Sequence, residues 1–197
     1  MLFPKEFQAL IDELKSLPHV GEKTAERLAN HIFEFNKKDR QALAQVILEI
    51  NNLKTCKRCF NLASRDLCAI CEDKNRKISV LAVVETPLHI APLERAGYRG
   101  VYHVLGGLIA SFLHDPNELH LKELLERIEK NEIKEVILAL DNSLEGETTA
   151  MYVIKEVKNQ KSKVKISRLA QGLSTGSNLE YADETTVREA LRGRREI

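Results

Sequence analysis

Hydrophobic positions recur at helical spacing through the first part of the chain. Apolar residues three and four positions apart predict three helices: the first ends before Pro18, the second begins near Glu22, and the third covers about residues 39–53. Asp39 is the expected N-cap of the third helix. The apolar face of that helix consists of Leu43, Val46, Ile47 and Ile50. We therefore predict a helical unit over residues 1–53.

The pattern changes after residue 77, where apolar strand segments alternate with helical segments. Residues 78–84 form an apolar run rich in β-branched side chains, which is typical of a buried parallel strand. Further strands are expected at 100–105, 135–140 and 163–169, with helices at 87–96, 118–131 and 147–158. This order predicts a mostly parallel sheet with helices on its faces over residues 78–172, and a strand/helix segment at 173–197. The expected fold class is α+β in several domains.

All four cysteines of the chain lie in two close pairs between the helical part and the first strand. Cys56 and Cys59 form one CxxC pair, and Cys68 and Cys71 form the second, eight residues further on. Four thiolates at this spacing suit one tetrahedral Zn²⁺, and four sulfur ligands leave no position for substrate, so we expect one structural zinc ion per chain. A disulfide and a thioredoxin-like redox motif are the alternatives. The module at 54–77 is too short to bury a sufficient core, so the metal should decide whether it folds.

Composition and charge limit the classes of protein. The chain has 197 residues, 43% of them hydrophobic and 30% charged, as expected for a soluble globular protein. No apolar run approaches the roughly 20 residues of a membrane span, and the N-terminus lacks the pattern of a secretory signal, so a cytoplasmic protein is expected. The net charge of +1 provides no overall attraction for a polyanion. Any contact with nucleic acid must therefore come from local groups.

The connection between the first two predicted helices, LPHVGEKTAERLA at residues 17–29, has the helix-hairpin-helix pattern. Such a hairpin presents backbone N–H groups and a helix N-terminus, which favour an anion. Lys23 and Arg27 lie four residues apart on one face and can reach a phosphate without reading sequence. His19 stands where these hairpins usually have glycine, whereas Gly21 is retained, so His19 either crowds the hairpin or contacts the phosphate. An ordinary turn with a solvated basic face is the alternative.

Acidic residues follow two of the predicted strands. Glu85 ends the first strand of the α/β part, and Asp141, Glu145 and Glu147 follow a later one. Because the carboxyl ends of parallel strands converge at one edge, these carboxylates can gather there and hold Mg²⁺. In the alternative interpretation, Glu145 and Glu147 only stabilise a helix N-terminus.

The histidines show no spacing typical of metal ligands. His89, His114 and His120 are expected on the surface or in loops. We expect His31 to be packed beside an apolar helix face, and His103 to lie on a strand in the core or at an interface.

Taken in order, these motifs resemble the RecR family of bacterial recombination mediators over nearly the whole chain. The resemblance rests on the hairpin segment, CKRC and CAIC, VVE, YHVLGG, EVILALDNSLEGETTA and LEYADETTVREALRGRRE. It implies a helix-hairpin-helix DNA-binding region at 1–53, a four-cysteine zinc finger at 54–77, a Toprim domain at 78–172 and a C-terminal segment at 173–197.

The same resemblance implies a function in DNA repair. Members of the family act with RecO, and in many bacteria with RecF, to load RecA onto gapped DNA. They form dimers that close into tetrameric rings around duplex DNA. By resemblance, Lys23 and Arg27 contact DNA, the four cysteines hold zinc, and Glu145 and Glu147 fall in the segment that meets RecO.

An enzyme is the alternative, because Toprim domains also occur in nucleases, primases and topoisomerases. Catalytic Toprim domains carry a Glu and an Asp-x-Asp-x-Glu pattern for Mg²⁺. Here the second Asp is replaced by Ser143, a poor ligand for a hard cation, which implies a non-catalytic domain with at most weak Mg²⁺ binding at Glu85 and Asp141. The chain also departs from the family after VVE, because His89 stands near a position that is often acidic.

Overall fold

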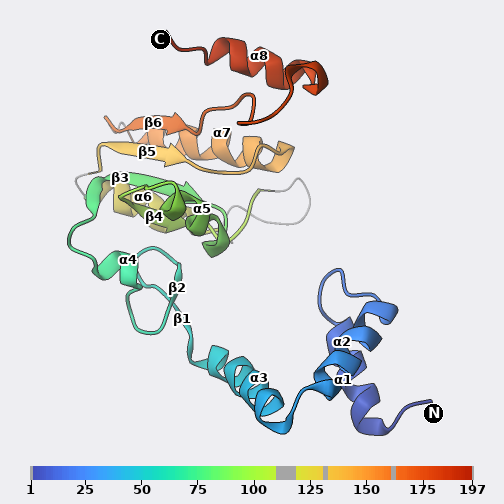
Figure 1. The fold of residues 1–197 in the computed structure, drawn as a ribbon. Helices are drawn as coiled ribbons and strands as arrows, with labels where there is room; N and C mark the ends of the chain where they lie inside the picture. The colour runs from blue at the N-terminus through green and yellow to red at the C-terminus, as the bar shows by residue number, and fades with distance from the viewer. Residues whose placement is uncertain (1, 110–118, 131–132, 161–162, 197) are drawn as a thin grey trace. The chain divides into compact units, whose positions relative to one another are not determined.

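The computed structural model describes residues 2–109, 119–130, 133–160 and 163–196 (Figure 1). The chain divides into two compact units, Met1–Leu53 and Lys54–Ile197. Each unit has a core of its own, and His114 lies outside the described residues.

The first unit is helical, as the sequence predicts. It contains α1 (Lys5–Lys15), α2 (Glu22–Glu34), α3 (Lys37–Glu49) and the 3-10 turn η1 (Ile50–Asn52). Ile11 of α1 packs against Ala25 and Ala29 of α2, whose small side chains let the two helices approach closely. Phenylalanines and leucines from α1 and the preceding turn complete this small core.

Two details of this unit differ from expectation. The N-cap of α3 is Asn36, whose side chain accepts a hydrogen bond from the Asp39 backbone N–H at 2.9 Å, so Asp39 lies inside the first turn. The side chain of His31 is 70% exposed, lies 3.9 Å from the Glu34 carboxylate and meets the edge of the Phe35 ring, so the expectation that it is packed beside an apolar face is wrong. The predicted apolar face of α3 exists, but no side chain of α3 is buried in the described chain.

The second unit begins with the cysteine module. The antiparallel strands β1 (Lys54–Thr55) and β2 (Leu62–Ala63) form a hairpin, and the short helix α4 (Ala69–Glu72) follows. The hairpin carries the first pair of cysteines, and the second pair lies at the start of α4 and within it.

A parallel four-stranded sheet forms the centre of the second unit, with the strand order β4-β3-β5-β6. Its strands are β3 (Lys77–Val84), β4 (Gly100–Val104), β5 (Glu135–Leu138) and β6 (Lys165–Arg168). The connecting segments contain η2 (Pro87–His89) with α5 (Ile90–Arg95), then α6 (Leu121–Lys130) and α7 (Leu144–Asn159). The predicted alternation of strands and helices is confirmed.

The two faces of the sheet bury different layers. Leu81 and Val83 point to the face covered by α6 and α7, whereas Ala82 and Val84 point to the face covered by α5 and by part of the cysteine module. The chain crosses from β3 to β4 on one side of β3, and then from β4 back past β3 to β5 on the other side. Because right-handed crossovers that run in opposite directions lie on opposite faces of a sheet, the connecting helices cover both faces. Figure 1 shows the four strands side by side between these layers.

The described part of the C-terminal segment contains the 3-10 turn η4 (Leu179–Tyr181) and helix α8 (Glu184–Arg192), and no strand. Asp183 caps α8 by accepting a hydrogen bond from the Thr186 N–H. None of the helices in the described ranges has the length and apolar character needed to cross a bilayer.

Candidate functional site

The four cysteines converge on one point, as their spacing predicts. All four are buried and free, and their sulfur atoms lie within 4.8 Å of one another. The β1–β2 hairpin brings Cys56 and Cys59, and α4 brings Cys68 and Cys71. The donor set of four thiols from two tight turns fits a tetrahedral Zn²⁺ ion.

Hydrogen bonding and burial shift the pKa values of three of the thiols in different directions. The hydrogen bond between Cys59 and Cys71 lowers the pKa of Cys71 to about 6. The same bond, together with burial, raises the pKa of Cys59. Burial also raises the pKa of Cys68. Binding of zinc would therefore displace protons from the remaining thiols.

Two arginines surround the cysteine cluster with positive charge. Arg58 donates a hydrogen bond to the Cys71 carbonyl at 2.9 Å. Arg127, from α6, donates to the carbonyl of Tyr102 and, at 3.4 Å, to that of Arg58, and its charge helps to lower the pKa of Cys71. Because a tetrathiolate zinc centre carries a net negative charge, these guanidinium groups would stabilise it from just outside the ligand set.

The cysteine module is attached to the outer edge of the sheet. The Val104 N–H of edge strand β4 donates to the Cys59 carbonyl at 2.9 Å. Phe60, in the left-handed conformation with φ 63°, stacks on the His120 ring at 3.7 Å between centroids and meets the edge of His103. All of β4 is buried although it is an edge strand, and the module supplies a backbone partner for Val104 at its end.

Two histidines near this junction, His103 and His120, differ in burial and in their partners. His103 lies in the core, as expected, and burial lowers its pKa to about 3. His120 lies in the turn before α6, as expected of a loop residue, and is half-buried where its ring stacks on Phe60. Nε2 of His103 lies 2.8 Å from the His120 carbonyl, so His103 donates there in its Nε2–H tautomer.

The hairpin between α1 and α2 presents its polar groups to solvent. Lys23 and Arg27 lie on the first two turns of α2, where Lys23 is exposed and Arg27 borders an open surface hollow, and His19 has φ 63°. His19 therefore adopts the left-handed conformation for which glycine is best suited. Gly21 is the N-cap of α2 and has φ −79°, and no side-chain hydrogen bond caps the helix. The first N–H groups of α2 are thus available to an anion.

The predicted acidic group is divided in the structure. Glu85 and Asp141, which follow the neighbouring strands β3 and β5, come together with His89 in one cluster. Glu147 instead forms a bidentate ion pair with Arg168 at 2.6 and 2.7 Å, which lowers the pKa of that carboxyl. Glu145 is exposed on the first turn of α7. The sequence therefore located Glu85 and Asp141 correctly at one edge, but it missed His89.

Ser143 has a structural role in this region. Its hydroxyl caps α7 by accepting a hydrogen bond from the Gly146 N–H at 3.1 Å. No larger residue fits at position 146 without a shift of the backbone, because a Cβ on Gly146 would lie 2.0 Å from the Asp141 carbonyl oxygen. The turn after β5 is therefore held tightly, which fixes the backbone of Asp141.

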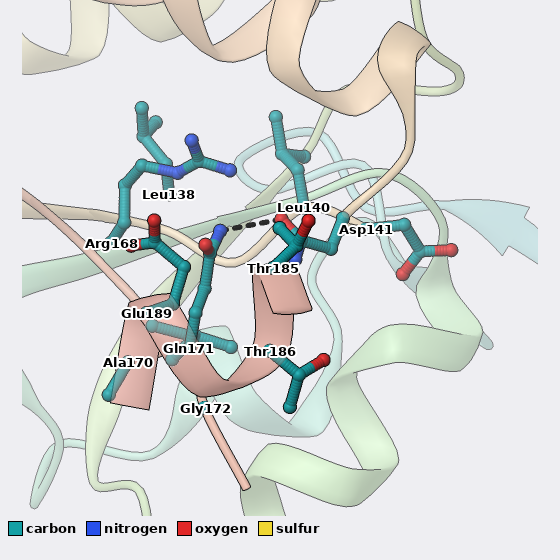
Figure 2. A pocket seen from close by; sticks show the side chains of 12 residues that line it. Leu138, Leu140, Asp141, Arg168, Ala170, Gln171, Gly172, Thr185, Thr186 and Glu189 are labelled. Carbon is teal, nitrogen blue, oxygen red and sulfur yellow. Dashed lines mark hydrogen bonds between the residues drawn. The ribbon is translucent and has the colours of Figure 1, made fainter. Parts of the chain in front are cut away.

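A pocket of about 350 Å³ lies between the ends of β5 and β6 and helix α8 (Figure 2). Gln171 donates a hydrogen bond to the Asn142 side chain across this pocket at 2.5 Å. Figure 2 shows the Asp141 carboxylate turned away from Gln171 and Glu189. Asp141 thus borders the pocket while its carboxylate belongs to the cluster with Glu85.

These features define a protein in which a helix-hairpin-helix unit, a four-cysteine metal module and a parallel α/β domain follow one another. Family models match in the same order: the RecR helix-hairpin-helix at residues 7–50, the RecR zinc finger domain with four cysteines at 53–73, the Toprim domain at 79–170 and the RecR C-terminal model at 172–195.

Whole proteins named "Recombination protein RecR" are similar over their full length. The chain is 44% identical to one such protein from Thermus thermophilus, with 100% of each covered. It is 42% identical to that from Rubrobacter xylanophilus (99% of this chain, 98% of the relative) and 41% to that from Finegoldia magna (100% and 98%). The chain belongs to the RecR family.

Of the two residues that the sequence analysis missed, only one has a local signal in the sequence. His89 lies four residues after Glu85, a spacing that could have suggested a shared turn. Arg127 gives no local signal, because it reaches the cysteine module from a helix far along the chain.

Proposed function

We propose that this chain is a recombination protein of DNA repair that binds DNA through the α1–α2 hairpin and has no catalytic activity of its own. The observation that carries this proposal is the uncapped N-terminus of α2 with Lys23 and Arg27 beside it. Family membership supports it, because the relatives are named for recombination. Zinc in the cysteine module would serve the structure alone, since four sulfur ligands leave no open position.

A salt series of DNA binding tests the hairpin. Every phosphate that the protein no longer neutralises should reduce the slope of log affinity against log salt by about 0.9, so Lys23→Ala with Arg27→Ala should weaken binding and flatten the slope. Lys37→Ala with Lys38→Ala is the matched control, because it removes the same charge from exposed positions of α3. If both double variants behave alike, only net charge matters and the hairpin assignment is wrong.

His19 can be tested in the same assay. We propose that its side chain adds a further phosphate contact, as does the backbone near Gly21. His19→Gly keeps a residue suited to φ 63° and removes only the imidazole, so a loss of DNA affinity without a loss of folding would support the contact. Equal affinity would show that His19 only occupies the turn.

The protein partners also belong to this proposal. Acting on chromosomal DNA in the cytoplasm, the protein would help to load RecA. It would contact RecO, and in some bacteria RecF, through the start of α7. Its chains would associate as dimers or tetramers that close around DNA. Glu145→Lys is the clean test of the RecO contact, because Glu145 is exposed, whereas changing Glu147 would also leave Arg168 without its partner. Undiminished RecO binding by Glu145→Lys would remove α7 from the interface.

The Mg²⁺-dependent enzyme remains the second candidate, because Glu85 and Asp141 do meet at the strand ends. Against it, Ser143 replaces the second Asp and caps α7. Metal-dependent nicking, relaxation or primer synthesis that disappears in Glu85→Gln would establish the enzyme; the absence of turnover on plasmid and primed DNA would exclude it.

A further inference from the structure

Strand β6 is an outer edge of the parallel sheet. In the described part of the chain it pairs only with β5, and it is the last strand in the order β4-β3-β5-β6 (Figure 1). The Lys165 N–H donates to the Lys134 carbonyl, just before β5, at 2.9 Å. Because the backbone groups of successive residues in a parallel ladder point to alternate sides, the N–H and C=O of Ile166 point away from β5. They have no backbone partner among the described residues.

A groove of about 420 Å³ lies beside this edge, between β6 and α7. Its apolar lining consists of Ile154 and Val157 from α7, and of Val164 and Ile166 from the segment of β6. Three of these side chains, Ile154, Val164 and Ile166, are only half-buried. A chain that paired with β6 would direct every second side chain toward α7 and into this groove. Backbone pairing and a place for apolar side chains are therefore available together.

The segment that forms the groove is strongly basic. Residues 155–168 contain six Lys and Arg residues and one Glu, although the whole chain has a net charge of only +1. Lys165 and Arg168 are held in ion pairs within the chain, whereas Lys158 lines the groove and Lys163 is exposed next to it. Lysines along an edge oppose pairing with a second basic edge, so they disfavour the addition of another β6 strand. The same charges attract a strand that carries carboxylates.

We propose that the β6 edge binds an extended segment of a partner protein in which acidic and apolar residues alternate. The segment adds a strand to the sheet by pairing with the outward backbone groups of Ile166. Its apolar side chains fill the groove against α7, and its carboxylates lie near Lys158 and Lys163. This proposal does not depend on DNA binding by the hairpin.

The test uses the zinc-loaded, full-length protein and a fluorescein-labelled peptide of alternating Asp and Ile, with binding followed by fluorescence anisotropy. The protein should bind this peptide more tightly than a peptide of alternating Lys and Ile. The Asp–Ile peptide with every backbone amide N-methylated should not bind, because it cannot pair as a strand. Bound peptide should slow hydrogen exchange at the Ile166 amide. The Lys165 amide is the internal control, since it already donates to Lys134.

Variants test the backbone edge and its charge separately. Ile166→Pro removes the outward N–H but keeps the bonds to β5, because proline is tolerated where an edge N–H faces solvent, and it should weaken peptide binding about tenfold. Ile166→Val should bind as the parent does. Lys158→Ala with Lys163→Ala should weaken binding and reduce its salt dependence. Lys74→Ala with Lys122→Ala is the matched control, because it removes the same charge from exposed positions elsewhere.

Unchanged zinc content and circular dichroism would show that the variants are folded; if Ile166→Pro does not fold, the methylated peptide and the lysine variants decide the question. The proposal is overturned if the Asp–Ile peptide binds no better than the Lys–Ile or the methylated peptide, if exchange at the Ile166 amide is not slowed, or if both lysine double variants bind alike. A loss of DNA affinity in Lys158→Ala with Lys163→Ala, without peptide binding by the parent, would assign this edge to nucleic acid instead. Ile166→Pro should keep the DNA affinity of the parent, which separates this test from that of the hairpin.

Discussion

At the scale of single residues, Gly146 shows how one missing side chain positions a candidate site. A Cβ at this position would lie 2.0 Å from the Asp141 carbonyl oxygen and 3.0 Å from its carbonyl carbon, both of them backbone atoms. The turn after β5 must therefore open to accept any larger residue. Its capping hydrogen bond from Gly146 N–H to Ser143 would be strained as well.

Gly146→Ala should lower the free energy of unfolding by about 1–3 kcal/mol, the usual cost of forcing an extra methyl group into a packed site. Thermal or urea unfolding of the full chain measures this. Met151→Ala is the matched control, because Met151 lies on the same helix and is 70% exposed, so its substitution leaves the packing of the turn unchanged. Equal stability of the two variants would mean that the turn yields freely.

At the scale of elements, the cysteine module and edge strand β4 depend on one another. The module provides a carbonyl partner for Val104, and without it the edge of β4 would be open to solvent or to another strand. Structural zinc contributes roughly 10–16 kcal/mol in small modules, which is comparable to the stability of a whole domain.

Cys56→Ser should therefore release zinc and lower solubility more than it lowers DNA binding by the hairpin. Metal analysis and hydrogen exchange at the Val104 amide measure the two structural effects, and exchange there should become faster. The serine variant purified folded and soluble, without zinc and with a protected Val104 amide, would contradict this prediction.

An ion pair also connects the end of the cysteine module to the α/β domain. Arg76, whose side chain is 8% exposed, forms a bidentate ion pair with Glu94 of α5 at 2.6 and 2.7 Å. The Tyr102 hydroxyl donates to the same carboxylate at 2.6 Å. The hydrogen bond from Arg76 is the largest cause that holds the pKa of Glu94 below its ordinary value of 4.5.

The pH dependence follows from the sign of this shift. Because the pKa of Glu94 is lower in the folded state, its contribution is complete above about pH 4.5 and is lost as the pH falls through the folded value. Glu94→Gln should cost about 1–3 kcal/mol at pH 7, since it removes the bidentate partner of the buried Arg76 and leaves only the Asp73 carboxylate, 3.4 Å from Nε, as a counter-charge among the described residues. Unfolding measured from pH 7 to about pH 3 should show a smaller loss of stability in Glu94→Gln than in the parent; parallel curves would refute the role of this pair.

The sequence predicted the elements better than their junctions. Apolar runs such as residues 78–84 locate strands because burial on both faces demands them. Helix starts were missed by a few residues where the cap is chosen by local geometry, as with Asn36 in place of Asp39. The cysteine spacing sufficed for the metal site. The closeness of His89 to Asp141, with one ligand atom of each within 4.8 Å of the other, could not be predicted, because it depends on which strands become neighbours.

At the scale of the whole molecule, one chain carries almost no net positive charge to attract a polyanion, because its 30 Lys and Arg residues are balanced by 29 Asp and Glu residues. Its net charge is +1, and the hairpin contributes Lys23 and Arg27. If these make two phosphate contacts, the salt slope of a single chain should be about −1.8, which is weak for a DNA-binding protein. Association of several chains would multiply those contacts, which is why the proposed dimers and tetramers matter for function.

The exposed face of α3 and η1 is where that association can be tested. Val46, Ile47 and Ile50 are 54%, 58% and 61% exposed, an arrangement that suits contact with a second copy of the chain. Ile47→Glu should shift the protein toward monomers in analytical ultracentrifugation, while Gln45→Glu, on an exposed polar position of the same helix, should not. If association supplies the additional phosphate contacts, Ile47→Glu should also flatten the salt dependence of DNA binding although Lys23 and Arg27 are intact. A monomer that keeps the parent's salt slope would show that one hairpin is enough.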